Sequence, residues 1–337
     1  MDLRVGVIGC GMIGKEHIKR LQYRIRGAVV TAVCDVFEEG AKAGSELAGG
    51  VKIFTDYNEM IADPEVDAIV VTTPGNFHKG PVLAAIKAGK PVFSEKPLAT
   101  TAADCKEIVD AEMASGKHLV QVGFMRRYDR GYKQVKEIID GGTFGKPMIV
   151  KCTHRAESVA DSYTTEMAVT DTAIHEIDVL PWLLGGDEWD HVQCIMPRVT
   201  KNAHEGLQDP QVMIMTTKAG VVCVLEVNVN CGFGYDINCE VVCEDGVINL
   251  PAPSFPTVRK DFKISTKIED NWILRFIDSY DVELQDWVDS IEKGISVGSS
   301  AWDGYVAELT ADALVASQKS GAVEQVVTGG TPDFYKK

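Results

Sequence analysis

Basic residues are scarce in this chain relative to acidic ones. The 337 residues include 34 Lys and Arg against 49 Asp and Glu, which gives a formal net charge of −15. Such a charge opposes binding to the phosphate backbone of nucleic acids and to anionic bilayers. We therefore expect no nucleic acid partner and no membrane partner.

Long apolar runs are also missing. Although 45% of the residues are hydrophobic, no stretch approaches the ~20 apolar residues that a membrane-spanning helix needs. The opening Met1–Val5 lacks the basic region, longer apolar stretch and small-residue cleavage site of a signal peptide. The expectation is a cytoplasmic protein that does not span a membrane.

The cysteine pattern lacks the features of two structural frameworks. The nine cysteines are odd in number and none is spaced C-x-x-C, unlike secreted disulfide scaffolds and structural zinc sites. We interpret them as reduced core residues and expect no metal site. Internal repeats and long Gly/Ser linkers are absent too, so nothing suggests a repeat array or a disordered arm.

The first third of the chain alternates short β-branched runs with helical patterns, which is typical of βαβ units. The predicted strands are Leu3–Ile8, Ala28–Cys34, Val51–Phe54, Ala68–Val71, Val92–Ser94 and His118–Val122. The predicted helices are Ile13–Arg24, Ala41–Ala48, Tyr57–Ala62, Pro81–Ala88 and Ala102–Ser115. We expect a Rossmann-type domain over residues 1–122, an α/β doubly wound parallel sheet with helices on both faces.

After Gly123 strands follow one another without intervening helices, which favours an antiparallel sheet. The predicted strands are Pro147–Arg155, Val192–Pro197, Gln211–Thr217, Val221–Val229, Tyr235–Val242 and Val247–Leu250. Helical patterns cover Gly131–Ile139, Thr170–Leu184, Asp278–Glu292 and Ala301–Ser320. A length of 337 residues favours two domains, so we expect an α+β domain over residues 123–337, with a largely antiparallel open sheet covered by helices.

The segment Gly9–Gly14 reads G-C-G-M-I-G and lies between the first predicted strand and helix. Glycines there permit the turn, the close approach of a pyrophosphate and tight strand–helix packing. Asp35 follows the second strand, 21 residues after Gly14, where an acceptor for ribose hydroxyls belongs. Its carboxylate would repel a 2′-phosphate, and Val36–Glu39 supplies no cation. The predicted cofactor is NAD rather than NADP.

Two other segments carry polar side chains in suggestive places. Ser94–Pro97 reads S-E-K-P and ends the fifth strand at the ligand-binding edge of an open α/β sheet; alone it would more often be a charged surface turn. Asp171 and His175 are four residues apart and share one helix face. A surface Asp–His pair is the commoner explanation of that spacing, and no third ligand nearby supports zinc.

Together these segments resemble the inositol dehydrogenase branch of the glucose–fructose oxidoreductase and inositol dehydrogenase superfamily, over essentially the whole chain. The residues that carry the resemblance are Val5–Gly9, Glu95–Thr101, Gln121–Asp129, Tyr163–Thr165 and Asp171–Trp182. The most discriminating stretches are M-R-R-Y-D and T-A-I-H-E-I-D. The chain departs from close members at Pro74, where they can carry a tryptophan.

The resemblance implies a catalytic trio and two sets of binding residues. The catalytic residues would be Lys96, Asp171 and His175. The NAD-binding residues would be Gly9, Gly11, Met12, Ile13, Gly14, Asp35, Thr73, His78, Glu95 and Lys96. The substrate-binding residues would be Lys96, Met125, Arg126, His154, Asp171, Thr172, His175 and Tyr235. It also implies a homotetramer built through the open sheet of the second domain and a role in inositol catabolism.

The implied reaction is oxidation of the 2-hydroxyl of myo-inositol to 2-keto-myo-inositol (scyllo-inosose). Such an oxidation removes a hydride from carbon and a proton from oxygen. A neutral imidazole, with an ordinary pKa of about 6.5, suits the proton-accepting role of His175. An ammonium at Lys96 would stabilise the developing alkoxide, although a neutral Lys96 acting as the base remains open. Other inositol isomers or pyranose sugars, and a non-catalytic NAD-sensing regulator, are the alternatives.

Overall fold

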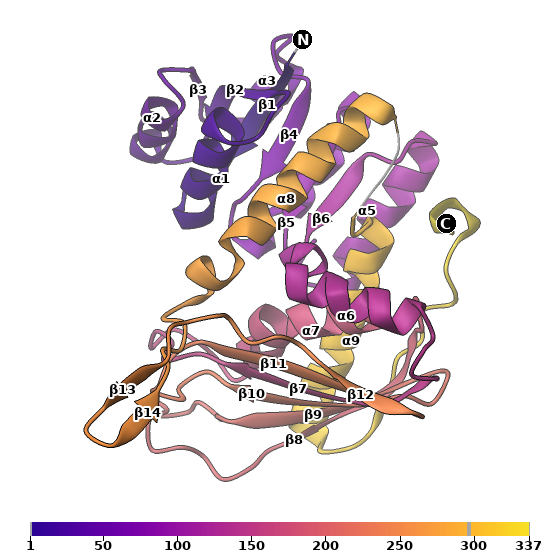
Figure 1. The fold of residues 1–337 in the computed structure, drawn as a ribbon. Coiled ribbons are helices and arrows are strands. Elements are labelled where there is room, and N and C mark those ends of the chain that lie inside the picture. Colours follow the sequence, from indigo (N-terminus) through magenta and orange to yellow (C-terminus); the bar gives the residue numbers. More distant parts are fainter. Residues whose placement is uncertain (1, 295–297, 337) are drawn as a thin grey trace. The chain divides into compact units, whose positions relative to one another are not determined.

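The computed structural model describes residues 2–294 and 298–336, which form two compact units (Figure 1). The first unit comprises Met1–Met125, Tyr280–Leu309 and Thr328–Lys337, and the second Arg126–Ser279 and Thr310–Val327. The sequence division assigned all of 123–337 to one domain. The structural division differs because Leu284, Trp287 and Val288 complete the hydrophobic core of the first unit.

The first unit contains a six-stranded, all-parallel sheet of the order β3-β2-β1-β4-β5-β6. Its strands are β1 (Leu3–Ile8), β2 (Ala28–Cys34), β3 (Lys52–Phe54), β4 (Ala68–Val71), β5 (Val92–Glu95) and β6 (Val120–Gly123). The order reverses direction at β1 and β4, which makes the sheet doubly wound. The predicted parallel Rossmann sheet is confirmed.

Helices follow the strands of this sheet. They are α1 (Met12–Tyr23), α2 (Glu38–Leu47), α3 (Tyr57–Ala62), α4 (Lys79–Ala88) and α5 (Ala102–Ser115). Asp56 and Thr101 cap α3 and α5 by accepting hydrogen bonds from backbone amides of the first turn. Gly89 and Gly116 end α4 and α5 in the left-handed conformation that glycine adopts without strain.

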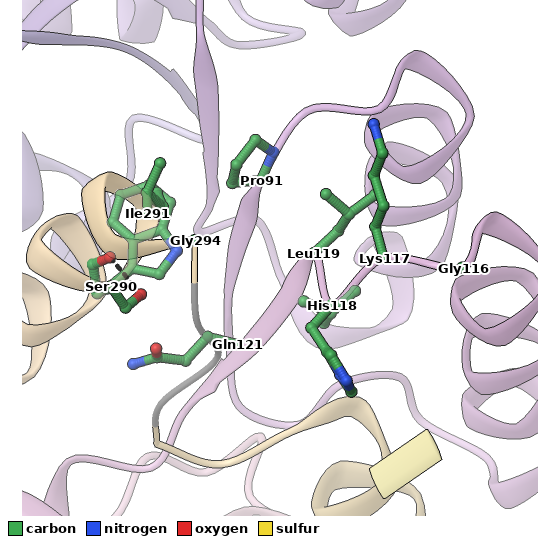
Figure 2. Close-up of a pocket in the computed structure, with 11 residues that line it drawn as sticks. Pro91, Gly116, Lys117, His118, Leu119, Gln121, Ser290, Ile291 and Gly294 are labelled. Atoms are coloured by element: carbon green, nitrogen blue, oxygen red, sulfur yellow. Dashed lines mark hydrogen bonds between the residues drawn. The ribbon is translucent and has the colours of Figure 1, made fainter.

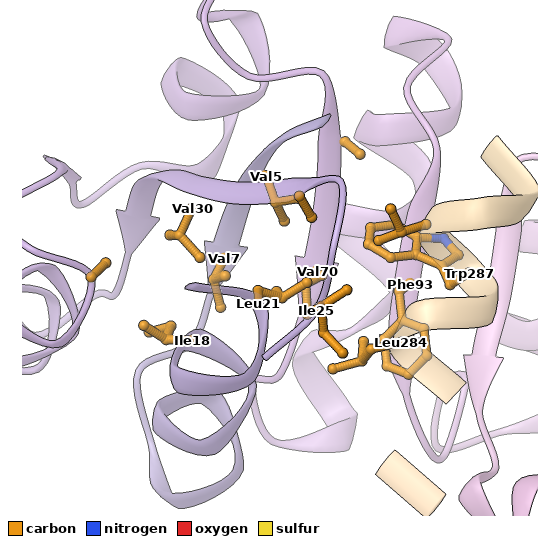
Figure 3. Close-up of a cluster of buried hydrophobic side chains, with 14 of the residues drawn as sticks. Val5, Val7, Ile18, Leu21, Ile25, Val30, Val70, Phe93, Leu284 and Trp287 are labelled. Atoms are coloured by element: carbon orange, nitrogen blue, oxygen red, sulfur yellow. The ribbon is translucent and has the colours of Figure 1, made fainter. Parts of the chain in front are cut away.

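A hydrophobic core joins the sheet to helices from both ends of the chain (Figure 3). Val5 and Val7 of β1 and Val70 of β4 pack with Ile18 and Leu21 of α1 in this core. The helix α8 (Trp272–Lys293) adds Leu284, Trp287 and Val288 to it. Trp287 meets Phe93 of β5 edge to face, with ring centroids 5.8 Å apart. The strand β5 is thereby backed by packed side chains of α8.

The second unit contains a seven-stranded sheet of the order β12-β11-β7-β10-β9-β8-β15. Its strands are β7 (Pro147–Arg155), β8 (Trp189–Ile195), β9 (Gln211–Thr217), β10 (Val222–Asn228), β11 (Asp236–Cys243), β12 (Gly246–Asn249) and β15 (Glu324–Gln325). Only β7 and β10 pair in parallel; the other pairs are antiparallel. The predicted largely antiparallel sheet is confirmed.

Helices lie on one face of this sheet (Figure 1). They are α6 (Arg130–Asp140), α7 (Ile174–Leu183) and the second half of α9 (Ala301–Ser320). Buried and half-exposed residues alternate along β9 and β10, as a sheet covered on one face requires. A π-helical turn, Ala168–Ala173, immediately precedes α7, where the sequence predicts one continuous helix from Thr170.

A short hairpin of β13 (Val258–Lys260) and β14 (Lys263–Ser265) was not predicted from the sequence. All six strand residues are exposed, so neither strand has the apolar alternation that marks a half-buried strand. Three-residue 3₁₀ turns at Gly75–Phe77 and Asp333–Tyr335 and the four-residue turn Met125–Tyr128 were also not predicted. Among the described residues, no helix has the length and apolar character to cross a bilayer.

Candidate active site

In the glycine loop between β1 and α1, two glycines lie against backbone atoms and a third borders open space. Gly9 has φ +95°, and a Cβ there would lie 2.7 Å from the backbone of Thr72. A Cβ on Gly14 would lie 2.0 Å from the Gly9 carbonyl oxygen. At Gly11 a Cβ would meet nothing within 4 Å. Gly9 and Gly14 therefore make the turn, while Gly11 borders open space.

The first turn of α1 suits an anion. Gly11 is its N-cap residue, no side chain caps the helix and the first turn holds no acidic residue. Unsatisfied backbone N–H groups and the positive end of the helix dipole favour a phosphate at such a terminus. The open space beside Gly11 and the uncapped helix fit the diphosphate of a dinucleotide.

Asp35 follows β2, and its carboxylate is held in place by the backbone. The Cys10 amide donates to Oδ2 at 2.8 Å and the Phe37 amide donates to Oδ1 at 2.9 Å. A Cβ on Gly40 would lie 3.1 Å from this carboxylate, so the residue at 40 must be small. Each oxygen keeps acceptor capacity. An oriented carboxylate beside the glycine loop is what the hydroxyls of a ribose require.

Glu95 and Lys96 lie at the carboxyl end of β5, as the sequence predicts. The carboxylate of Glu95 lies 2.7 Å from Nε2 of the fully buried His17 and accepts a 3.2 Å hydrogen bond from the Lys96 amide. Lys96 itself is half-buried. The His17–Glu95 pair fixes the backbone at the point where Lys96 begins.

His78 joins two strand ends. Its Nδ1 lies 2.7 Å from the Pro97 carbonyl oxygen and its Nε2 lies 2.6 Å from the Thr73 carbonyl oxygen. Burial lowers the pKa of His78, while the two carbonyl acceptors act in the opposite direction. The ring thereby connects the end of β4 to the loop that carries Lys96. This bridging contact was not part of the sequence-based expectation for His78.

In the second unit, three of the predicted substrate residues meet in one buried network. The Arg126 guanidinium Nη2 lies 3.1 Å from Nδ1 of His154, and the Tyr235 hydroxyl lies 3.2 Å from Nε2 of the same ring. Burial raises the pKa of Tyr235, although the positive charge of Arg126 opposes this shift. Tyr235 therefore keeps its proton near neutral pH and can donate it in a hydrogen bond.

Glu176 completes this network, although it was not among the residues predicted from the sequence. Its carboxylate forms an ion pair with Arg126 and lies 3.1 Å from Nδ1 of His154. Two residues further along α7, Asp178 accepts a 2.9 Å hydrogen bond from Nε of Arg127. Both acids are buried in α7. Two arginines in sequence, and two acids within one apolar helix, are the pattern that could have predicted these pairs, because buried charges need partners.

The π-helical turn before α7 carries the remaining predicted residues of this unit. Asp171 is exposed in the turn, whereas His175 is buried in the first turn of α7. The rings of His175 and His154 have centroids 6.3 Å apart. Thr172 shares a hydrogen bond with the Tyr163 hydroxyl at 2.5 Å. Distortions of this kind recur at functional sites, because they re-aim side chains that a regular helix would place elsewhere.

The predicted site residues are thus divided between the units. The residues predicted to bind NAD belong to the first unit, as do Lys96 and Met125, which is buried. Arg126, His154, Asp171, Thr172, His175 and Tyr235 belong to the second. Among the described residues, no group of three or more His, Cys, Asp or Glu side chains is arranged to hold a metal ion.

The first unit also has a cavity of about 390 Å³ (Figure 2). Pro91, Leu119 and Gln121 border it on the sheet side, and Ser290, Ile291 and Gly294 on the side of α8. Pro91 precedes β5 and Leu119 precedes β6, so the cavity lies at the amino ends of these strands. The glycine loop, Asp35 and Lys96 follow the carboxyl ends. This cavity is therefore separate from the predicted cofactor edge.

Two family models match the chain. Residues 3–124 match the oxidoreductase family with an NAD-binding Rossmann fold, and residues 132–249 match the GFO/IDH/MocA C-terminal domain. An inositol 2-dehydrogenase of Azotobacter vinelandii is 50% identical over 336 residues, 99% of each chain. One of Pseudomonas savastanoi pv. phaseolicola is 48% identical, covering 99% of this chain and 100% of the relative.

Solved structures agree with these matches. The crystal structure of myo-inositol dehydrogenase from Lactobacillus casei, in complex with NAD(H) and myo-inositol, superposes with a TM-score of 0.97 at 42% identity and covers 100% of both chains. That of scyllo-inositol dehydrogenase from the same organism, with NAD(H) and scyllo-inositol, gives a TM-score of 0.88 at 25% identity, with 97% of this chain and 100% of that chain covered.

Proposed function

Because this chain belongs to the oxidoreductase family with an NAD-binding Rossmann fold, we propose that it oxidises myo-inositol at the axial 2-hydroxyl to scyllo-inosose. The reaction is a hydride transfer that releases one proton. The observation that carries the proposal is the open glycine loop with its oriented Asp35 in a chain 50% identical to an inositol 2-dehydrogenase. The first unit would bind the cofactor, and the second, together with Lys96 and Met125 of the first, would bind the polyol.

NAD would supply the electrophilic carbon that accepts the hydride. The amides at the start of α1 would hold its diphosphate, with Gly11 giving the room for close approach. Asp35 would accept hydrogen bonds from the adenosine ribose and disfavour the 2′-phosphate of NADP. Thr73 and Glu95 would shape the part of the cofactor site that lies away from Asp35. His78 would act there by positioning Thr73 and the loop that carries Lys96.

The catalytic group of the proposal is Lys96 with Asp171 and His175. His175 would accept the proton of the substrate hydroxyl, and Lys96 would stabilise the alkoxide as it forms. Asp171 would orient the imidazole or a substrate hydroxyl. The residues themselves support this division of labour, since a buried imidazole and a half-buried amine are suited to holding or moving a proton.

The substrate would be bound by side chains that match a neutral ring covered with hydroxyls. Arg126, His154 and Tyr235 present donors and acceptors from one buried network. Thr172 would add a hydroxyl and Met125 a soft apolar contact. An alcohol lacking most ring hydroxyls leaves such groups unpaired, at ~1–3 kcal/mol each, so short aliphatic alcohols would be poor substrates.

We further propose a cytoplasmic homotetramer. The seven-stranded sheet has helices on one face (Figure 1), and its other face carries Val212 and Ile214 of β9 and Val222 and Val224 of β10, all only half-buried. Packing these faces between copies would remove that apolar area from water. The nine cysteines are free thiols, as expected in a reducing compartment.

The decisive experiment is a turnover panel with purified protein, NAD⁺ or NADP⁺, the inositol isomers and common hexoses, followed by NADH absorbance. The expected result is highest kcat/KM for myo-inositol with NAD⁺, undiminished by exhaustive chelation. Activity confined to another isomer or to a pyranose would change the substrate and leave the fold and cofactor unaffected. Tight NADH binding without turnover of any polyol would favour an NAD-sensing regulator instead.

Replacement of the catalytic group tests the assignment of residues. Lys96→Ala and His175→Ala should each lower kcat by about 10²–10⁴-fold while the Kd for NADH changes little. The pH profile identifies the proton acceptor: kcat/KM should rise as that group loses its proton, and this limb should vanish in His175→Ala. If the limb persists there and vanishes in the Lys96 variant, the lysine is the base. Near-wild-type turnover in both variants would refute the assignment.

A further inference from the structure

The hairpin β13–β14 projects from the second unit (Figure 1). All its strand residues are exposed, and three of its side chains are large and apolar: Val258 is 53% exposed, Ile264 70% and Phe262, at the turn, 112%. Hairpins of two short strands are marginally stable in water on their own. Apolar side chains at a protruding tip favour association with another surface.

The hairpin also has a charge opposite to that of the chain. Residues 258–267 carry Arg259, Lys260, Lys263 and Lys267 against Asp261 alone, a local net charge of +3. The chain as a whole has −15, which leaves −18 on the remaining residues. Lys267 pairs with Asp270 at 2.9 Å. For Arg259, Lys260 and Lys263 the described part of the chain supplies no ion-pair partner within 4.0 Å.

The base of the hairpin is anchored beside the buried network. The Tyr235 amide donates to the Glu269 carbonyl at 2.7 Å. A Cβ on Gly234 would lie 3.1 Å from Ile268, so the two segments approach closely only because residue 234 is glycine. The hairpin is therefore an exposed arm on a fixed support. Four residues after the end of β14, the carbonyl of Glu269 contacts the backbone of Tyr235, a proposed substrate residue.

We propose that this arm docks onto the acidic surface of a second copy of the chain. Charge complementarity favours that occupant, because three cations that find no ion-pair partner among the described residues belong to a chain whose other residues carry −18, and every copy supplies both charges. Phe262 and Ile264 would provide the apolar centre of the contact and the cations its polar rim. The contact is separate from the open-sheet interface proposed above and does not depend on the catalytic activity.

Mass measurement across a dilution series tests the contact. We compare wild type with Phe262→Ser and with the double variant Lys260→Glu/Lys263→Glu by sedimentation velocity, from 50 to about 500 mM salt. Both variants should weaken one association step at least tenfold. The step should also weaken with salt in wild type and become insensitive to salt in the charge variant. Unchanged association constants in both variants would overturn the proposal.

Matched controls separate docking from general damage. Lys201→Glu/Lys319→Glu makes the same charge change at exposed lysines elsewhere in the second unit, and it should leave the association unchanged. All variants should keep the wild-type unfolding temperature and Kd for NADH, because the strand residues of the arm are exposed within one copy. Equal loss of association in the control would show an effect of net charge and overturn the role of the arm.

Crosslinking identifies the occupant directly. A photoreactive benzophenone amino acid replaces Phe262, and ¹⁴N- and ¹⁵N-labelled copies are mixed before illumination. The expected products are mixed-label peptides joining position 262 to an acidic segment of another copy. Exclusively same-label crosslinks after full exchange of subunits, or crosslinks only to added DNA or to anionic vesicles of phosphatidylserine, would refute docking between copies. Either result would leave the turnover panel, and hence the proposed reaction, unaffected.

Discussion

Arg126 pairs with Glu176, and Arg127 pairs with Asp178. The two acids lie two residues apart on α7. All four side chains are buried. Removing charges from water costs several kcal/mol per ion, and the pairing returns this only while both partners are present. Loss of one partner is therefore more damaging than loss of both.

Glu176→Gln should lower the free energy of unfolding by about 3 kcal/mol, because Arg126 then remains charged without its carboxylate. The double replacement Arg126→Met/Glu176→Leu should cost less than this single change. Urea unfolding of the two variants and wild type measures both values. A double variant less stable than Glu176→Gln would contradict the account of the pair as an ion pair whose members compensate each other.

His78 should make stability depend on pH. Its pKa is lowered in the folded chain by burial, so below the ordinary value of about 6.5 the unfolded chain binds more protons than the folded one. Stability from this residue is present above that pH and is lost as the pH falls below it. Wild type should therefore lose more stability than His78→Gln between pH 7.5 and 5.5, measured as the difference in urea midpoint. Parallel losses would show that His78 does not contribute.

At the scale of the elements, several strands and helices could be predicted to the residue. The strand β1 and the helices α3, α5 and α9 have the predicted bounds, because apolar periodicity, caps and glycines all mark the same limits. The hairpin β13–β14 and the π-helical turn before α7 could not. The hairpin buries neither face, so it lacks the apolar alternation of a half-buried strand. The π-helical turn spans only six residues, too few for its altered periodicity to stand out from that of the helix that follows.

The site was predictable in part for related reasons. Gly11 and Asp35 follow from a motif whose spacing has a physical cause. The pairing of Glu176 with Arg126 and His154 depends on strands and helices brought together across the second unit. The two adjacent arginines and the two acids of one apolar helix indicate buried charges that need partners, but a single sequence does not show which of these side chains meet or that His154 joins them.

The glycine loop provides a matched pair of variants. Gly11→Ala should leave the unfolding temperature of the cofactor-free protein within a degree or two of wild type, because its Cβ would meet nothing within 4 Å, yet should weaken NADH binding at least tenfold. Gly14→Ala should lower both the unfolding temperature and the affinity for NADH, since its Cβ would lie 2.0 Å from the Gly9 carbonyl oxygen. Fluorescence titration with NADH and thermal unfolding measure the two effects. Wild-type NADH affinity in Gly11→Ala would contradict a diphosphate at this position.

At the scale of the molecule, the thiols should be protected by the fold. Eight of the nine cysteines are buried and only Cys231 is half-buried. Burial raises the pKa of Cys10, Cys34 and Cys194 to about 12, so these residues hold almost no thiolate at neutral pH. Titration of the native protein with a chromogenic disulfide should show one fast thiol per chain, absent in Cys231→Ser, and nine after denaturation. Two or more fast thiols would contradict the buried positions.

The first unit is assembled from three stretches of chain, and this sets an order on synthesis. A ribosome delivers the six-stranded sheet first, but Leu284, Trp287 and Val288, which close its core, emerge only after the whole of Arg126–Ser279. At ordinary elongation rates that interval is on the order of ten seconds. During it Phe93 and its neighbours lack the cover of α8, so we expect the nascent sheet to need chaperones until translation has passed α8. An excised fragment ending at residue 125 inherits that exposed face permanently.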